Sequence, residues 1–150
     1  FSYSKIKLFK PIYSVLGVGY ISIGSGTFCS LLPCLIIFFF GDDLNYLVRF
    51  MLLIPILLIS FISLNGEFKN EDPSFVVIDE FAGMWISLLL FDGIIMILIS
   101  FFLFRFFDIT KFLGINKIEK LNGSLGIMLD DIVAGIYTLI IVFFIKIFLF

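Results

Sequence analysis

The sequence contains no histidine, and its only two cysteines are Cys29 and Cys34. It therefore lacks the side chains that build zinc and other soft-metal sites, and it has no histidine to act as a base or nucleophile. Neither cysteine is followed six positions later by an arginine, which a loop holding a thiolate beside a phosphate would require. We therefore expect no thiol catalysis and interpret both cysteines as small apolar residues.

Charged residues are scarce, at 15% of the 150 residues, whereas 61% are hydrophobic and 22 are phenylalanine. The mean hydropathy of +1.21 is far above what a soluble domain tolerates. The net charge of −2 leaves no basic surface for nucleic acid, so we expect no nucleic-acid partner. The composition predicts an integral membrane protein in contact with the lipid bilayer. It also predicts one domain over residues 1–150, because no linker divides the chain.

Five apolar stretches predict an all-α membrane bundle with four to five short spans. They lie at residues 27–41, 44–64, 75–90, 93–107 and 125–150. Three of them are shorter than the roughly 20 residues that cross the hydrocarbon core. The glycine-rich stretch GVGYISIGSGT, upstream at 17–27, is expected to form a re-entrant or loop-like segment.

Basic residues predict the orientation of this bundle. The turns on the opposite side, at 41–45 and 91–93, are nearly free of cations, and Asp42, Asp43 and Asp92 in them are expected to be solvated. Because basic residues favour the cytoplasmic side, the basic face is predicted to be cytoplasmic. With the amino terminus inside, that face carries eight of the ten basic residues: Lys5, Lys7, Lys10, Lys69, Arg105, Lys111, Lys117 and Lys120.

Two pairs of adjacent acids interrupt the apolar stretches, in IDEFAG at 78–83 and LDDIVAG at 129–135. An ionised carboxylate within the hydrocarbon costs on the order of 3 kcal/mol, and a helix dipole returns only about 0.3–1 kcal/mol. Asp79, Glu80, Asp130 and Asp131 therefore need a positive partner. One alternative is that each pair merely caps a helix start at the membrane interface.

Oxygen ligands without histidine or cysteine match Mg²⁺, and less selectively Mn²⁺ or Ca²⁺. Small residues follow both pairs, at Ala82–Gly83 and Ala134–Gly135, and they let helices approach closely in lipid. We therefore predict that the four acids meet as ligands of one divalent-metal site.

The segment before the last span carries groups suited to a phosphate. Arg105, Asp108 and Lys111 are three residues apart, so on a helix end they lie on one side, with Asp108 able to orient the two cations. Gly123, Ser124 and Gly126 precede a predicted helix, where backbone N–H groups can approach an anion. A flexible turn with ordinary positive-inside residues is the alternative. In the turn GEFKNEDPS, Asp72 and Glu67 are possible accessory acids.

These motifs resemble the phosphatidylglycerophosphatase A family of bacterial membrane lipid phosphatases. The resemblance rests on DPSFVVIDEFAGMW at 72–85, FRFFDITK at 104–111 and GSLGIMLDDIVAG at 123–135, with GSGTFCSLL at 24–32 similar to the family's first block. The chain departs from the family at Ser25 and Phe112, where proline is usual, and at Ser124, where glycine is usual. None of these departures removes a charge. The residues that carry over by position are Asp72, Asp79, Glu80, Gly83, Arg105, Asp108, Lys111, Gly123, Gly126, Asp130 and Asp131.

The resemblance implies Mg²⁺-dependent hydrolysis of phosphatidylglycerophosphate to phosphatidylglycerol and inorganic phosphate. It places the protein in the cytoplasmic (inner) membrane of a bacterium, as a multi-pass protein with its active site facing the cytoplasm. In the mechanism that we expect, Asp79, Glu80, Asp130 and Asp131 hold the metal. Arg105 and Lys111, oriented by Asp108, offset the charge of the phosphoryl oxygens. Water and an aspartate both remain open as the nucleophile.

Two other classes of function are compatible with paired acids in a membrane. A CDP-alcohol phosphotransferase also uses aspartates and Mg²⁺, but beyond Asp92–Gly93 its longer sequence pattern is absent. An ion-coupled transporter subunit would place the acids near the membrane midplane. The sequence leaves the oligomeric state undetermined.

Overall fold

The computed structural model describes residues 10–12, 14–64, 76–121 and 124–150, and every regular element in them is helical. This confirms the predicted all-α class. The elements, in chain order, are η1 (Val18–Tyr20), α2 (Ser25–Phe40), α3 (Tyr46–Leu64), α4 (Ile78–Ser87), α5 (Ile94–Thr110), α6 (Ile115–Glu119) and α7 (Ser124–Leu149).

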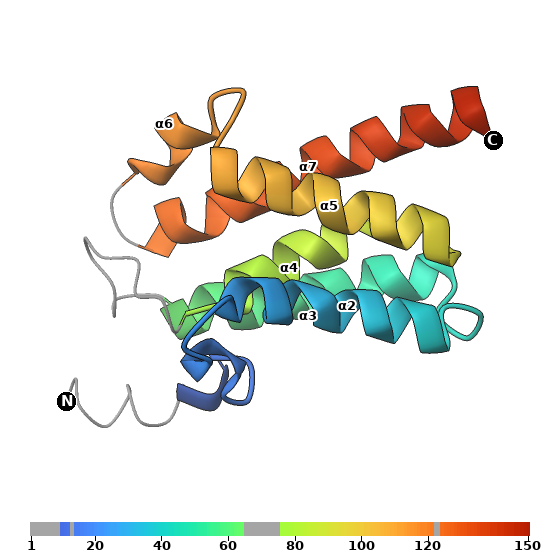
Figure 1. The fold of residues 1–150 in the computed structure, drawn as a ribbon. Helices are drawn as coiled ribbons and strands as arrows, with labels where there is room; N and C mark the ends of the chain where they lie inside the picture. The colour runs from blue at the N-terminus through green and yellow to red at the C-terminus, as the bar shows by residue number, and fades with distance from the viewer. Residues whose placement is uncertain (1–9, 13, 65–75, 122–123) are drawn as a thin grey trace.

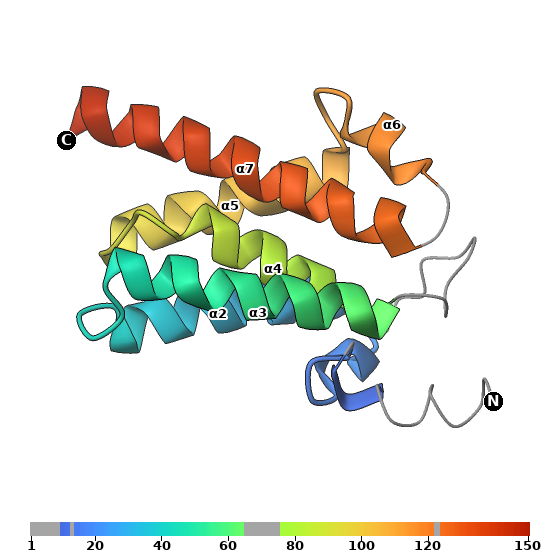
Figure 2. The same ribbon diagram turned by 180° about the vertical axis from the view of Figure 1, so that it is seen from behind.

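The short helix α4 lies at the centre of the bundle. Both ribbon views place it between α2 and α3 on one side and α5 and α7 on the other (Figures 1 and 2). Its residues from Ala82 to Ser87 are all buried, as are Leu88 and Leu89 just after it. Met84, Trp85 and Leu88 form the main core with Phe104 of α5 and Ala134 of α7. The apolar sequence of α4 therefore serves packing on every side.

The number of spans predicted from the sequence is not confirmed. Of the helices in the described parts of the chain, α7 alone is long and apolar enough to cross a membrane, over Leu125–Leu149. The apolar helices Ser25–Phe40 and Tyr46–Ile62 are shorter. Ten residues of α4 extend only about 15 Å, half of a hydrocarbon core. The apolar stretch at 75–90 is thus explained by enclosure within the bundle.

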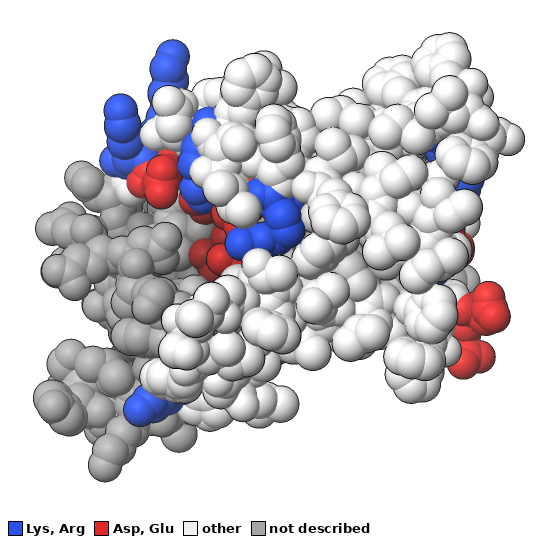
Figure 3. Space-filling view, viewed as in Figure 1, with Lys and Arg blue, Asp and Glu red and all other residues white. Residues whose placement is uncertain are grey.

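The flanks of the bundle are apolar. Large hydrophobic side chains are exposed along the outer helices, among them Phe39 on α2, Ile54 on α3, Phe102 on α5 and Phe148 on α7. In the space-filling view this surface is almost free of charge, and the charged side chains gather at its two ends (Figure 3). Such a large apolar surface marks a membrane or protein contact, and an all-round apolar surface agrees with the predicted association with a bilayer.

The glycine-rich stretch is loop-like up to residue 24, as expected. It contains the single turn η1, and Gly17 and Gly24 adopt positive φ angles of 97° and 72°. Only glycine takes such angles without strain. The last three residues of the stretch, 25–27, already belong to α2, so the loop delivers the first turn of α2 to the start of α4.

Arg49 holds together the end of the bundle where α4 finishes. Its buried guanidinium donates to the carbonyl oxygens of Leu88 (3.2 Å), Phe91 (2.9 Å) and Gly41 (3.2 Å), and it pairs with Asp92. Asp92 remains exposed, as expected, and its carboxylate also pairs with Arg49. A buried guanidinium needs a carboxylate and several acceptors, and Asp92 lies where the ends of α2 and α4 supply them.

Candidate functional site

Three of the four acids that were expected to meet lie together at the start of α4. Asp79 lies in the first turn of α4, and Asp130 and Asp131 lie in the second turn of α7. Each offers one oxygen, and these oxygens all lie within 4.8 Å of one another. The three side chains are nearly inaccessible, at 4%, 2% and 3% exposure respectively. We refer to Asp79, Asp130 and Asp131 as the aspartate trio.

Two glycines bring the trio together. A Cβ at Gly83 would lie 2.5 Å from the carbonyl oxygen of Asp131 and 2.8 Å from the ring of Phe104. A Cβ at Gly135 would collide with the carbonyl oxygen of Gly83. The helices α4 and α7 therefore touch backbone to backbone one turn beyond the acids, which is the close approach expected from the small residues.

The trio fits a hard divalent cation. The Oδ1 atom of Asp131 is buried and accepts no hydrogen bond from the described residues. A buried carboxylate oxygen without a donor is costly, and a cation satisfies it. The trio offers only oxygen atoms, the donor set of Mg²⁺, Mn²⁺ or Ca²⁺. Asp79, Asp130 and Asp131 are the residues that could hold it.

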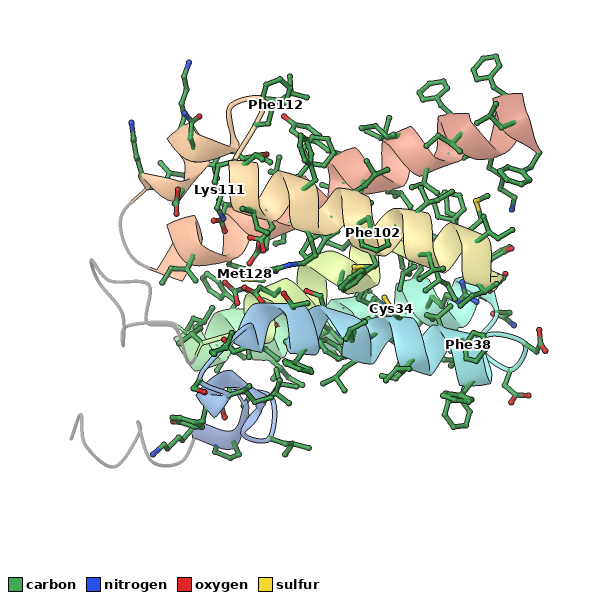
Figure 4. The ribbon with its side chains drawn as sticks, in the orientation of Figure 1. Cys34, Phe38, Phe102, Lys111, Phe112 and Met128 are labelled. Atoms are coloured by element: carbon green, nitrogen blue, oxygen red, sulfur yellow. The ribbon has the colours of Figure 1, made fainter. Side chains whose placement is uncertain are left out.

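Two cations border the trio, and Asp108 joins them as predicted. Arg105 Nη1 donates to Asp108 Oδ2, and Lys111 Nζ lies 3.3 Å from Asp108 Oδ1. Lys111 also reaches the trio, because its Nζ donates to Asp130 Oδ2 at 2.6 Å. It extends from the end of α5 toward the start of α7 (Figure 4). Asp108, at 8% exposure, is thus an orienting group between the two cations.

The backbone at Lys111 aims its side chain. Lys111 caps α5 in the left-handed conformation, with φ 50°, and its N–H donates to the carbonyl oxygen of Phe107 at 2.9 Å. Burial disfavours the charged form, but the carboxylates of Asp131, Asp130 and Asp108 outweigh it and raise the pKa of the ammonium above its ordinary value. Lys111 therefore stays charged beside the trio.

Glu80 faces another direction from its neighbour Asp79. Its Oε2 lies 3.7 Å from Nη1 of Arg105, and its carboxylate lies against Gly26 in the first turn of α2. Among the described residues, the group of acids close enough to share a metal comprises the trio and does not include Glu80. Successive residues on a helix point about 100° apart, so Asp79 faces α7 while Glu80 faces α2 and α5.

The glycine-rich turn before the last span differs from the prediction. Helix α7 begins at Ser124, so Asp130 and Asp131 lie beyond the first turn. Gly126 is therefore inside the helix, and its Cα faces the carbonyl oxygens of Leu121 and Glu119. Those oxygens would repel an anion on that side of Gly126, and the role of its backbone N–H in binding phosphate stays a prediction. Gly123, the side chain of Ser124, and the accessory acids Asp72 and Glu67 lie outside the described residues.

Sequence reasoning gave no role to Gly26 or Cys29. Gly26 receives the Glu80 carboxylate, and one turn later the Cys29 thiol donates to the carbonyl oxygen of Val77 at 3.1 Å. Both contacts fasten the start of α2 to the start of α4. The block GSGTFCSLL pointed to this segment, but its contact partners, Glu80 and Val77, are far away in the sequence and could not be identified from it.

Comparison with known proteins agrees with this site. A family model described as Phosphatidylglycerophosphatase A matches residues 12–146. A Bacteroides thetaiotaomicron protein, provisionally named phosphatidylinositol-3-phosphatase, is 44% identical over 77 residues, which are 49% of this chain and 48% of that protein. Phosphatidylglycerophosphatase A of Haemophilus influenzae is 44% identical over 79 residues (51% and 48%), and that of Escherichia coli is 37% identical over 78 residues (50% and 45%).

These matches span about half the length of the curated relatives. No solved structure matches the chain significantly. The family model, however, covers nearly all of it, including every residue of the trio and both bordering cations. The chain belongs to the phosphatidylglycerophosphatase A family.

Proposed function

We propose that this protein is a Mg²⁺-dependent lipid phosphatase that hydrolyses phosphatidylglycerophosphate to phosphatidylglycerol and inorganic phosphate. The observation that carries the proposal is the buried aspartate trio with Arg105 and Lys111 beside it, in a member of this family. The described part of the site contains these two cations and five carboxylates: Asp79, Glu80, Asp108, Asp130 and Asp131. This excess of negative charge favours the binding of a divalent cation, and the bound cation in turn attracts the phosphate.

The chain's own residues would bind and orient the phosphomonoester. Bound Mg²⁺ would supply positive charge to the phosphoryl oxygens and activate the attacking group. Arg105 and Lys111 would contact the remaining phosphoryl oxygens and stabilise the charge that develops on them. Asp108 would hold both cations in place, as its contacts with them suggest. The Nε atom of Arg105 is buried and donates to no described residue, so it is available to a phosphate oxygen.

The proposed reaction exchanges one P–O bond for another. A water oxygen forms a bond to phosphorus, the bond from phosphorus to the glycerol oxygen breaks, and the proton of the water goes to the departing alkoxide. Direct attack by an aspartate of the trio, followed by hydrolysis of the aspartyl phosphate, is the alternative. A single turnover with ³²P-labelled lipid, stopped by rapid quenching, distinguishes them, because only the aspartyl route attaches the labelled phosphoryl group to the enzyme.

We further propose that the protein is a multi-pass protein of the bacterial inner membrane with this site facing the cytoplasm. Support comes from the charges: Lys10, Lys117 and Lys120 are exposed and lie, with Arg105 and Lys111, in the segments at the acid end of the bundle. Arg49, at the other end, is buried in an ion pair. The excess of basic residues is typical of a cytoplasmic side.

The test is phosphate release by the purified protein in mixed micelles, with Mg²⁺ or with EDTA. We expect Mg²⁺-dependent release from phosphatidylglycerophosphate and a loss of at least about 100-fold in Asp79→Asn and Asp131→Asn. Asp42→Asn, at an exposed position, should retain full activity. Unchanged turnover and Mg²⁺ dependence in both trio variants would show that the metal site is wrongly assigned.

The name of the Bacteroides relative favours a second substrate for the same chemistry. Phosphatidylinositol 3-phosphate, like phosphatidic acid, should therefore be assayed as a competing phosphomonoester. If no lipid releases phosphate, the next assays are CMP release from a CDP-lipid and ion flux, which test the transferase and transporter alternatives. The acids lie at one end of the bundle, whereas a transporter site is expected near the midplane.

A further inference from the structure

We infer that Glu80 is a positioning residue for Arg105 and that Gly26, which has no side chain, leaves the space that the Glu80 carboxylate occupies. The inference rests on the proposed function, and it gives the glycine-rich block a role in the site. It also separates the two acids of IDEFAG, with Asp79 assigned to the metal and Glu80 to the arginine that binds the phosphate.

Glu80 and Arg105 come from different helices and meet beside the trio. The Glu80 Oε2 atom lies 3.7 Å from Arg105 Nη1, and the same nitrogen contacts Asp108 Oδ2. Asp108 is three residues from Arg105 on α5, so it cannot by itself fix the guanidinium relative to α4. Glu80 supplies that link from α4.

The first turn of α2 has a space that the Glu80 carboxylate occupies. A Cβ at Gly26 would fall onto both carboxylate oxygens of Glu80 and within 2.6 Å of its Cδ. The N-cap of α2 is Gly24, which has no side chain to cap the helix, and the first turn of α2 contains no acid. The positive end of this 16-residue helix therefore favours a carboxylate supplied by another element.

The start of α2 is held rigidly against α4. Cys29 Sγ donates to the carbonyl oxygen of Val77, the residue before α4, and the Ser30 hydroxyl donates to the carbonyl oxygen of Gly26 at 2.8 Å. Cys29 and Ser30 are both fully buried. Gly26 thus makes room for Glu80, and Glu80 in turn positions Arg105. The buried Nε atom of Arg105, which donates to no described residue, is then free to contact a phosphate oxygen.

The experiment measures metal binding and phosphate binding separately. Neither measurement requires the protein to turn over a substrate. Mn²⁺ binding is measured by the electron paramagnetic resonance signal of free Mn²⁺, and binding of inorganic phosphate by calorimetry with Mg²⁺ present. The variants are Glu80→Gln, which keeps the size of the side chain, and Gly26→Ala. Asp131→Asn represents a metal ligand, and Glu119→Gln is the control at an exposed position.

We expect Glu80→Gln to weaken phosphate binding about tenfold, the effect of losing one charge-assisted contact. Its Mn²⁺ affinity should stay within about threefold of wild type, whereas Asp131→Asn should lose about tenfold or more. Gly26→Ala should behave like Glu80→Gln. In an Arg105→Met background Glu80→Gln should have no further effect on phosphate binding, because coupled residues are non-additive.

Two results would overturn the inference. Loss of Mn²⁺ binding in Glu80→Gln equal to that in Asp131→Asn would make Glu80 a ligand. Additive effects of Glu80→Gln and Arg105→Met would show that Glu80 does not act through Arg105. Phosphate and Mn²⁺ binding without hydrolysis of any lipid would contradict the proposed reaction alone. If Gly26→Ala does not fold, Glu80→Gln, alone and in the Arg105→Met background, still tests whether Glu80 acts through Arg105.

Discussion

Replacing Gly83 by alanine should separate α4 from α7 and remove most phosphatase activity. An added Cβ would lie 2.5 Å from the Asp131 carbonyl oxygen, and bringing this separation to the 3.4 Å of ordinary contacts requires a shift of about 0.9 Å. The obstructing atom is backbone, so no side-chain rotation relieves it. Phe104, whose ring would be 2.8 Å away, blocks movement toward α5.

The shift reaches the proposed metal site directly. Asp131 supplies both the obstructing carbonyl and a carboxylate of the trio, and Asp79 lies one turn before Gly83 on α4. Mg²⁺ demands near-ideal geometry at about 2.0–2.1 Å from its ligands. A displacement of about 1 Å costs on the order of 100-fold in rate. Overpacking also destabilises the fold by roughly 1–3 kcal/mol, less about 1 kcal/mol from the higher helix propensity of alanine.

The assay compares kcat for phosphatidylglycerophosphate in mixed micelles, Mn²⁺ affinity and the midpoint of thermal unfolding in detergent. Gly135→Ala should behave in the same way, because its Cβ would meet the carbonyl oxygen of Gly83. Ile136→Val, on an exposed part of α7, is the control and should match wild type. A folded Gly83→Ala protein with wild-type kcat and Mn²⁺ affinity would refute the dependence of the site on this backbone contact.

Two further predictions concern residues outside the trio. Arg49→Met should lower the free energy of unfolding, measured by denaturation in detergent, by roughly 3–5 kcal/mol. The reason is that it leaves a carboxylate and several buried carbonyl oxygens unpaired. The control Lys146→Met, at an exposed position, should change the free energy of unfolding by less than about 0.5 kcal/mol. The double variant Cys29→Ala/Cys34→Ala should keep its Mg²⁺-dependent turnover, since both thiols are buried and donate to backbone carbonyls. Loss of turnover in a folded double variant would reopen a thiol mechanism.

Local spacing was sufficient to predict several parts of the site. Arg105, Asp108 and Lys111 are successive i,i+3 neighbours, so one helix end determines their contacts. Gly83 lies four residues after Asp79, and Gly135 lies four residues after Asp131, so the close contact between the two glycines brings these acids together one turn away. These are short-range relations within one helix or between two similar motifs.

Relations between distant elements were not predictable in the same way. Adjacent acids on a helix diverge, and the sequence does not show which of Asp79 and Glu80 faces α7. The pairing of Arg49 with Asp92 depends on where α2 and α4 end. The span count is not confirmed for a related reason, because an apolar helix enclosed by other helices and one facing lipid have the same composition.

The arrangement of charge explains how so apolar a chain tolerates five acids at one end. Glu80, Arg105, Asp108, Lys111 and Asp130 alternate in sign, and each contacts the next within 3.7 Å. This alternation ends at Asp130, and the buried Oδ1 atom of Asp131 accepts no hydrogen bond from the described residues. Negative charge is therefore concentrated where the oxygens of the aspartate trio converge. A divalent ion there would offset the negative charge that otherwise repels a phosphate, so metal would have to bind before the lipid headgroup.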